Sequence, residues 1–121
     1  MKHAERAFTI QVADYLHRAL PDDAVWTHFP AGEARSAKTG ALLKRYGTAR
    51  GMPDFIVYWH NRSFRIELKS PGGRLSPAQK AMHAQLLAAG VQICIAHRFE
   101  AVESFLQSVG VPLKTKQRRC A

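Results

Sequence analysis

Residues Gly51 to Lys69 read GMPDFIVYWHNRSFRIELK and contain two short runs of strand-forming residues on either side of a turn. The first run, Phe55 to Trp59, is aromatic and β-branched, and the second, Phe64 to Lys69, alternates apolar and polar side chains. The residues between them, His60 to Ser63, are typical of a turn. This stretch therefore predicts an antiparallel hairpin.

The register of the hairpin decides which side chains share a face. Opposed residues of an antiparallel pair lie on one face, and side chains alternate between the faces along each strand. A turn over His60 to Ser63 places Trp59 opposite Phe64. In that register Asp54 lies opposite Lys69, with Glu67 on the same face. The other face then carries the apolar set Phe55, Val57, Ile66 and Leu68.

Two carboxylates on one face offer the hard oxygen ligands that Mg²⁺ or Mn²⁺ prefers. Beside Asp54 and Glu67, the carbonyl oxygen of Leu68 is a candidate third protein ligand, and water would complete the shell. Lys69 would lie where it can contact a water molecule or a phosphate at the metal. The alternative is an exposed hairpin face on which Lys69 pairs with a carboxylate, and the spacing alone leaves both interpretations open.

The length of 121 residues predicts one domain, over residues 1–113, followed by a basic and disordered tail over 114–121. The composition is 46% hydrophobic, and no apolar run approaches the ~20 residues that span a membrane. The first residues lack the apolar core of a signal peptide. The two cysteines fit neither a disulfide framework nor a zinc site. We therefore expect a soluble, cytoplasmic protein that is not secreted.

Positive charge is the stronger compositional signal. Eighteen Lys and Arg against nine Asp and Glu give a net charge of +9, which favours a polyanionic partner such as nucleic acid. Part of the excess lies in residues 31–50, a glycine-punctuated segment that we interpret as a flexible basic loop, although a merely solvated loop is the alternative. Tyr46 of this segment is a candidate for stacking on unpaired bases. The candidate nucleic-acid contacts are Arg35, Lys38, Lys44, Arg45, Arg50 and Arg74.

The remaining segments predict a frame around the hairpin. Apolar spacing indicates a helix from about Ala4 to Leu20, and Val25 to Phe29 is typical of a short strand. A second helix runs from Ser76 to Ala89, followed by a buried strand over Val91 to Ala96 and a last helix over Glu100 to Val109. A strand, helix and strand in this order predict a parallel crossover. The fold class is therefore α/β, with a small mixed four-stranded sheet and the order α-β-β-β-α-β-α.

Two further polar residues lie near the predicted site. Ser76 and Gln79 have the spacing of a capping box, which gives Gln79 a structural explanation. Glu5 lies three residues before Phe8, close to the apolar stripe of the first helix, and could reach the edge of the sheet. A carboxylate at that position could equally serve only to stabilise the positive end of the helix.

This combination of residues resembles the PD-(D/E)XK nuclease superfamily, which has a restriction-endonuclease-like fold, and within it the virus-type replication-repair nuclease domain, VRR-NUC. The resemblance extends from about residue 5 to residue 96. Its signals are Gly51 to Asp54, Glu67 to Lys69, Gly73 to Ser76, and Gln79. The resemblance implies that Asp54 and Glu67 bind the metal, that Lys69 is the catalytic lysine, and that Glu5 and Gln79 border the site.

The activity implied by this resemblance is Mg²⁺- or Mn²⁺-dependent hydrolysis of phosphodiester bonds in DNA. The chain is similar to small stand-alone members of phages and bacteria, which implies a homodimer acting on branched, junction or flap DNA in replication, repair or recombination. The alternative is a non-catalytic DNA-binding module of the same fold. His60-Asn61 suggests an HNH-type nuclease, but no second histidine lies at the spacing that such a site requires. The residues do not decide whether the substrate is DNA or RNA, whether cleavage is endo- or exonucleolytic, or whether one or two metal ions bind.

Overall fold

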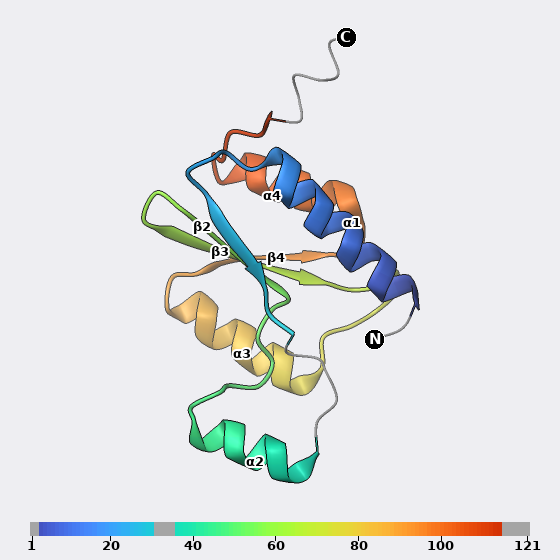
Figure 1. The fold of residues 1–121 in the computed structure, drawn as a ribbon, viewed down its shortest axis with the longest axis vertical. Helices are drawn as coiled ribbons and strands as arrows, with labels where there is room; N and C mark the ends of the chain where they lie inside the picture. Colours follow the sequence, from blue (N-terminus) through green and yellow to red (C-terminus); the bar gives the residue numbers. More distant parts are fainter. Residues whose placement is uncertain (1–2, 31–35, 115–121) are drawn as a thin grey trace.

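The computed structural model of the protein describes residues 3–30 and 36–114, and it contains a four-stranded mixed sheet (Figure 1). The strands lie in the order β1-β2-β3-β4, with β1-β2 and β2-β3 antiparallel and β3-β4 parallel. This arrangement confirms the predicted fold class. The elements are α1 (His3–Ala19), β1 (Val25–His28), α2 (Ala37–Arg45), β2 (Phe55–Trp59), β3 (Arg62–Leu68), α3 (Pro77–Ala88), β4 (Gln92–Ala96) and α4 (Phe99–Ser108).

Helices cover both faces of the sheet. Helices α1 and α4 pack on one face, α3 lies on the other, and α2 lies beyond α3 (Figure 1). The core lies between the sheet and the α1-α4 layer, where burial of apolar surface supplies the main stabilisation. The apolar hairpin face that the sequence predicts is the sheet's contribution to this core. Its members Phe55, Val57, Ile66 and Leu68 are all buried.

The hairpin turn is shorter than the sequence indicated. Only His60 and Asn61 lie outside the strands, and both have positive φ, +47° and +65°. Positive φ at both central residues is the mark of a type I′ turn, whose twist matches that of the paired strands. Asp23 supports this turn, because its Oδ1 accepts a 3.0 Å hydrogen bond from Trp59 Nε1 and its Oδ2 lies 2.6 Å from His60 Nε2.

The short turn changes the register. Trp59 pairs with Arg62, and not with Phe64 as the sequence indicated. The predicted register is therefore wrong by two residues, which leaves every side chain on its predicted face because the side-chain period is two. Continued past the Phe55–Ile66 pair, the observed register places Asp54 opposite Glu67 and not opposite Lys69.

The segment expected to be a flexible basic loop contains a helix. Helix α2 begins after Ser36, whose Oγ accepts a 3.1 Å hydrogen bond from the Thr39 N–H. None of its side chains is buried, and Leu42 is 47% exposed. The expectation of a loop is therefore wrong over residues 37–45, because the Ser36 cap and the Ala, Leu, Lys and Arg residues of α2 outweigh the poor helix propensity of Gly40.

The other predicted elements are confirmed to within two residues of their bounds, and α3 is the crossover between the parallel strands β3 and β4. The predicted disordered tail lies outside the described residues, apart from Lys114. Along the described chain, every helix is too short or too polar to pass through a bilayer.

Candidate active site

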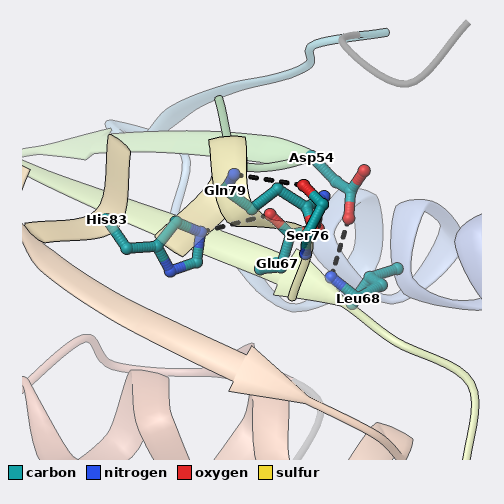
Figure 2. Close-up of polar contacts among 6 residues, drawn as sticks. All are labelled: Asp54, Glu67, Leu68, Ser76, Gln79 and His83. Atoms are coloured by element: carbon teal, nitrogen blue, oxygen red, sulfur yellow. Dashed lines mark hydrogen bonds and ion pairs between the residues drawn. The ribbon is translucent and has the colours of Figure 1, made fainter. Parts of the chain in front are cut away.

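Two carboxylates meet where β2 begins and β3 ends. Asp54 immediately precedes β2, and Glu67 is the penultimate residue of β3. Asp54 is held twice: its Oδ2 accepts a 2.7 Å hydrogen bond from the Leu68 N–H (Figure 2), and its carbonyl oxygen accepts a 2.6 Å bond from the Phe29 N–H. The backbone of three strands therefore fixes the position of Asp54.

Helix α3 supplies the partners of the second carboxylate. Glu67 is 2% exposed, and Gln79 Nε2 donates a 3.2 Å hydrogen bond to its Oε2 (Figure 2). His83 Nε2 lies 3.3 Å from Glu67 Oε1, and the imidazole is also buried. Because Gln79 and His83 are four residues apart on α3, they lie on one face of the helix and reach the same carboxylate. Each oxygen of Glu67 thus has one side-chain partner from α3.

The capping box fixes the orientation of the Gln79 amide. Gln79 Oε1 accepts a 2.8 Å hydrogen bond from the Ser76 N–H, and Ser76 Oγ accepts a 3.1 Å bond from the Gln79 N–H. With its oxygen engaged by the backbone, the amide presents its NH₂ group to Glu67 (Figure 2). Gln79 therefore caps α3 and contacts the carboxylate at the same time.

A neighbouring carboxylate opposes the ionisation of Glu67. Burial, then the negative charge of Asp54 and a hydrogen bond to it, raise the pKa of Glu67 to about 8, while the charge of Lys69 acts in the opposite direction. Burial and the Lys69 charge also lower the pKa of His83, although Asp54 raises it. Without a cation, the pair therefore holds a proton near neutral pH, and the imidazole beside it is neutral.

Lys69 lies next to this pair. Its N–H donates a 2.9 Å hydrogen bond to the Ala96 carbonyl oxygen, which keeps the residue aligned with β4. Its side chain is half-buried on the same face of the strand as Glu67, and its charge acts on both Glu67 and His83. The structure therefore brings together Asp54, Glu67, Lys69 and Gln79.

Glu5 is not tied to this cluster by any contact among the described residues. It lies in the first turn of α1, and its backbone carbonyl oxygen accepts a 2.8 Å hydrogen bond from Thr9 Oγ1. The N-terminal half of α1 does approach the segments that follow β3 and β4, because Phe8 shares a small cavity with Ser70 and His97. A role for Glu5 at the edge of the site stays a prediction.

Gly51 explains why the first motif begins with glycine. Its φ is +79°, and a Cβ at this position would lie 2.3 Å from the carbonyl oxygen of Ala78. The Gly51 backbone therefore packs directly against the first turn of α3, next to Gln79. Only glycine satisfies both the positive φ and this close approach.

A family model for the VRR-NUC domain matches residues 11–99 of the chain, which is most of its length. The chain belongs to the VRR-NUC family. A solved structure described as a VRR_NUC domain protein has a similar fold, with a TM-score of 0.65 and 23% sequence identity over 89% of this chain and 88% of the other. No curated protein matches the sequence. The predicted family is thus confirmed, and it is a family of nucleases, which implies a DNA substrate and a divalent metal in general.

The donor set of this VRR-NUC domain fits a hard divalent cation. Across the described residues, no three His, Cys, Asp or Glu side chains are grouped for a metal. The site instead offers two opposed carboxylates, Asp54 and Glu67, whose mutual repulsion a cation would relieve. In an extended strand the N–H and C=O of one residue point to the same edge, so the Leu68 carbonyl faces Asp54 as its N–H does. Mg²⁺ is usually bound by a few protein oxygens, and water molecules complete its coordination shell.

A cavity of about 870 Å³ opens beside the VRR-NUC carboxylates. Asp54 and Gln79 contribute to one wall, and α2 forms another. Of the predicted nucleic-acid contacts, Lys44 and Arg50 line this cavity. Lys38 and Arg45 lie elsewhere on α2, Arg74 precedes α3, and Arg35 falls outside the described residues.

His83 is the site residue that the sequence did not reveal. Among the histidines of the chain, it lacks the partner that an HNH-type site requires. The available signal was the four-residue spacing from Gln79 within a predicted helix, which places both side chains on one helix face.

Proposed function

We propose that this protein is a Mg²⁺- or Mn²⁺-dependent deoxyribonuclease that acts on branched, junction or flap DNA. The observation that carries the proposal is the pairing of Asp54 and Glu67 across β2 and β3, with Lys69 beside them, in a chain of a nuclease family. Two carboxylates so close together are costly without a cation, and a module that only attracted phosphates would gain nothing from them.

In this proposal Asp54, Glu67 and the Leu68 carbonyl hold the metal. When bound, the metal neutralises charge on the scissile phosphate and promotes attack by water. The Leu68 N–H orients Asp54, and Gln79 and His83 orient Glu67, so both carboxylates are positioned before substrate arrives. This preorganisation is the chain's own contribution to catalysis.

Lys69 has two possible roles in the same geometry. As an ammonium group it would stabilise negative charge on the phosphate in the transition state. As a neutral amine it would orient the attacking water or accept a proton from it. Lys44 and Arg50 would hold the backbone of the DNA beside the site, which predicts binding that weakens as salt increases.

The proposed biological setting is replication, repair or recombination within a bacterial or phage-infected cell. The described part of the chain contains one such carboxylate pair. Concerted cleavage of two strands would therefore require two copies, and we propose a homodimer.

The test is a panel of end-labelled single-stranded, fully paired, flap and four-way-junction DNAs incubated with Mg²⁺, with Mn²⁺ or with EDTA. The proposal expects cleavage only with metal and faster cleavage of the branched substrates. Binding without cleavage of any DNA in either metal would favour the alternative, a non-catalytic DNA-binding module of the same fold.

A further inference from the structure

One face of α2 forms a wall of the cavity beside Asp54. The residues of α2 on this wall include Ala37, Gly40, Ala41 and Lys44, whose spacing of three, four and seven residues defines a single helix face. Three of these four residues are Gly or Ala. Lys44 and the neighbouring Leu43 are the large side chains that α2 contributes to the lining, and the small residues beside them leave room in a space of about 870 Å³.

The charges of the cavity suit a polyanion that must reach Asp54. Among the described residues, the lining contains two cationic side chains, Lys44 and Arg50, and one acid, Asp54 itself. Ser76, Ala78 and Gln79 form the wall opposite α2, so the cavity leads directly to the side chain that orients Glu67. A chain of phosphates lying in the cavity would pass the two cations and meet the carboxylate pair.

The chain between β1 and β2 begins and ends at the site. Its two ends are joined by the hydrogen bond from the Phe29 N–H to the Asp54 carbonyl oxygen, so α2 is anchored on both sides at the site itself. A cavity of this volume has the size of a small-molecule pocket. It can admit a few unpaired nucleotides, whereas a double helix, whose major groove alone is about 12 Å wide, is too large.

An exposed aromatic ring lies close to the same helix. Tyr46 caps the carboxyl end of α2 and is 71% exposed. Aromatic rings stack on the faces of unpaired bases, and bases in a duplex are not available for this contact. Tyr46 thus offers a contact that suits single-stranded DNA at the end of the cavity wall.

We infer that the cavity between α2 and the Asp54–Glu67 pair takes an unpaired DNA strand, and that α2 covers this strand where it reaches the carboxylates. This inference rests on the proposed nuclease function and specifies its substrate. Selection of branched DNA then comes from a requirement for unpaired nucleotides at the site, and a fully paired duplex is excluded by its width.

The test introduces a large side chain on α2 that fills the cavity. A Cβ at Gly40 would meet nothing within 4 Å, and tryptophan has a higher helix propensity than glycine, so Gly40→Trp should fold and project its ring into the space. Leu42→Trp is the matched control, because Leu42 lies on the same helix, is half exposed and does not line the cavity. Ala37→Trp, on the cavity face, is a second filling variant, and thermal unfolding verifies that each variant folds.

Two readouts are needed. The first is fluorescence anisotropy of a labelled thymidine 12-mer in EDTA, where no cleavage occurs. We expect the dissociation constant to rise at least about tenfold in Gly40→Trp and Ala37→Trp, which corresponds to about 1.4 kcal/mol, and to change less than about twofold in Leu42→Trp. The second readout is Mn²⁺-dependent cleavage of a splayed-arm duplex and of a fully paired duplex of the same sequence.

The outcomes separate this inference from the proposed function. Loss of 12-mer binding in the filling variants supports the strand site, even if no DNA is cut and the nuclease proposal fails. Parent-like binding by folded Gly40→Trp and Ala37→Trp overturns the inference. Equal cleavage of both duplexes by the parent and by Gly40→Trp would also overturn it, while leaving the nuclease assignment in place.

Discussion

The backbone N–H of Leu68 donates a 2.7 Å hydrogen bond to Asp54 Oδ2, so the strand that carries Glu67 also fixes the other carboxylate (Figure 2). The relative position of the two acids therefore depends on strand pairing more than on the packing of their side chains. Strand pairing is rigid because the same strands supply the buried core residues Phe55 and Ile66. The site and the core of the protein are held by the same hairpin.

We expect Glu67 to make the stability of the metal-free protein fall as pH rises. The unfolded chain releases this proton near the ordinary pKa of 4.5, whereas the folded chain keeps it up to about pH 8. Between these values the folded state binds more protons, so the free energy of unfolding decreases with pH. Glu67→Gln has no ionisable group at this position, so this pH-dependent loss of stability is absent. Its free energy of unfolding should exceed that of the parent by on the order of a few kcal/mol above pH 8, with little difference near pH 4.

The measurement is urea unfolding from pH 4 to pH 9 in EDTA. Glu100→Gln, which removes a carboxylate from α4, controls for the loss of one negative charge. If the Glu67→Gln and parent curves run parallel over the whole range, Glu67 is not buried beside a second carboxyl as described here.

His83→Ala should weaken metal-dependent cleavage without removing a ligand. Glu67 Oε1 would lose its partner on α3, and its carboxylate would be less well oriented. Loss of such a supporting contact typically costs about 10- to 100-fold in metal affinity or activity. A Mn²⁺ titration of the cleavage rate measures this effect, with His17→Ala on the exposed face of α1 as the control. Equal Mn²⁺ dependence of the two variants would argue against a role for His83.

Gly51→Ala should destabilise the fold much more than Gly47→Ala. Both glycines have positive φ, so both substitutions cost about 1 kcal/mol of backbone strain. Only at Gly51 does the new Cβ also collide with the Ala78 carbonyl, which should raise the total to about 3 kcal/mol or more. Denaturant unfolding of the two variants measures the difference. Similar losses of stability would show that the contact between Gly51 and α3 is loose.

Lys69→Ala should bind both metal and DNA and yet cleave poorly. Loss of a positioned acid–base or charge-stabilising group typically lowers the rate about 100-fold or more. Single-turnover cleavage measures the chemical step, and anisotropy in EDTA measures DNA binding. Lys80→Ala removes an exposed lysine from α3 and controls for the loss of one positive charge. Parent-like cleavage by Lys69→Ala would exclude the lysine from the chemistry.

The sequence predicted the faces of the hairpin correctly and its register wrongly, for a physical reason. Alternation of apolar and polar residues determines which side chains point to the core, and a shift of two residues leaves that alternation unchanged. The shift itself depends on His60 and Asn61 adopting positive φ, which is uncommon for histidine. An Asn-Gly turn would have indicated the two-residue loop directly.

Helix α2 and His83 were missed for different reasons. Helix α2 has favourable local signals in the Ser36 cap and in its Ala, Leu, Lys and Arg residues, but it buries no side chain, so no core-facing apolar stripe marks it. His83 belongs to a helix that was predicted well, but its partner lies on β3, and single-sequence patterns do not place a helix face against a particular strand residue. The capping-box spacing predicted the structural role of Gln79, and only the family resemblance implied that it borders the site.

Single-turnover cleavage of a labelled flap DNA by Asp54→Ala in Mn²⁺, beside the parent protein, tests the central claim most directly. If Asp54 and Glu67 together hold the metal, the variant should lose at least about 100-fold in rate. It should still bind the DNA in EDTA, since Lys44 and Arg50 are unchanged. Cleavage by Asp54→Ala at the parental rate would contradict the claim that this carboxylate pair is the catalytic centre.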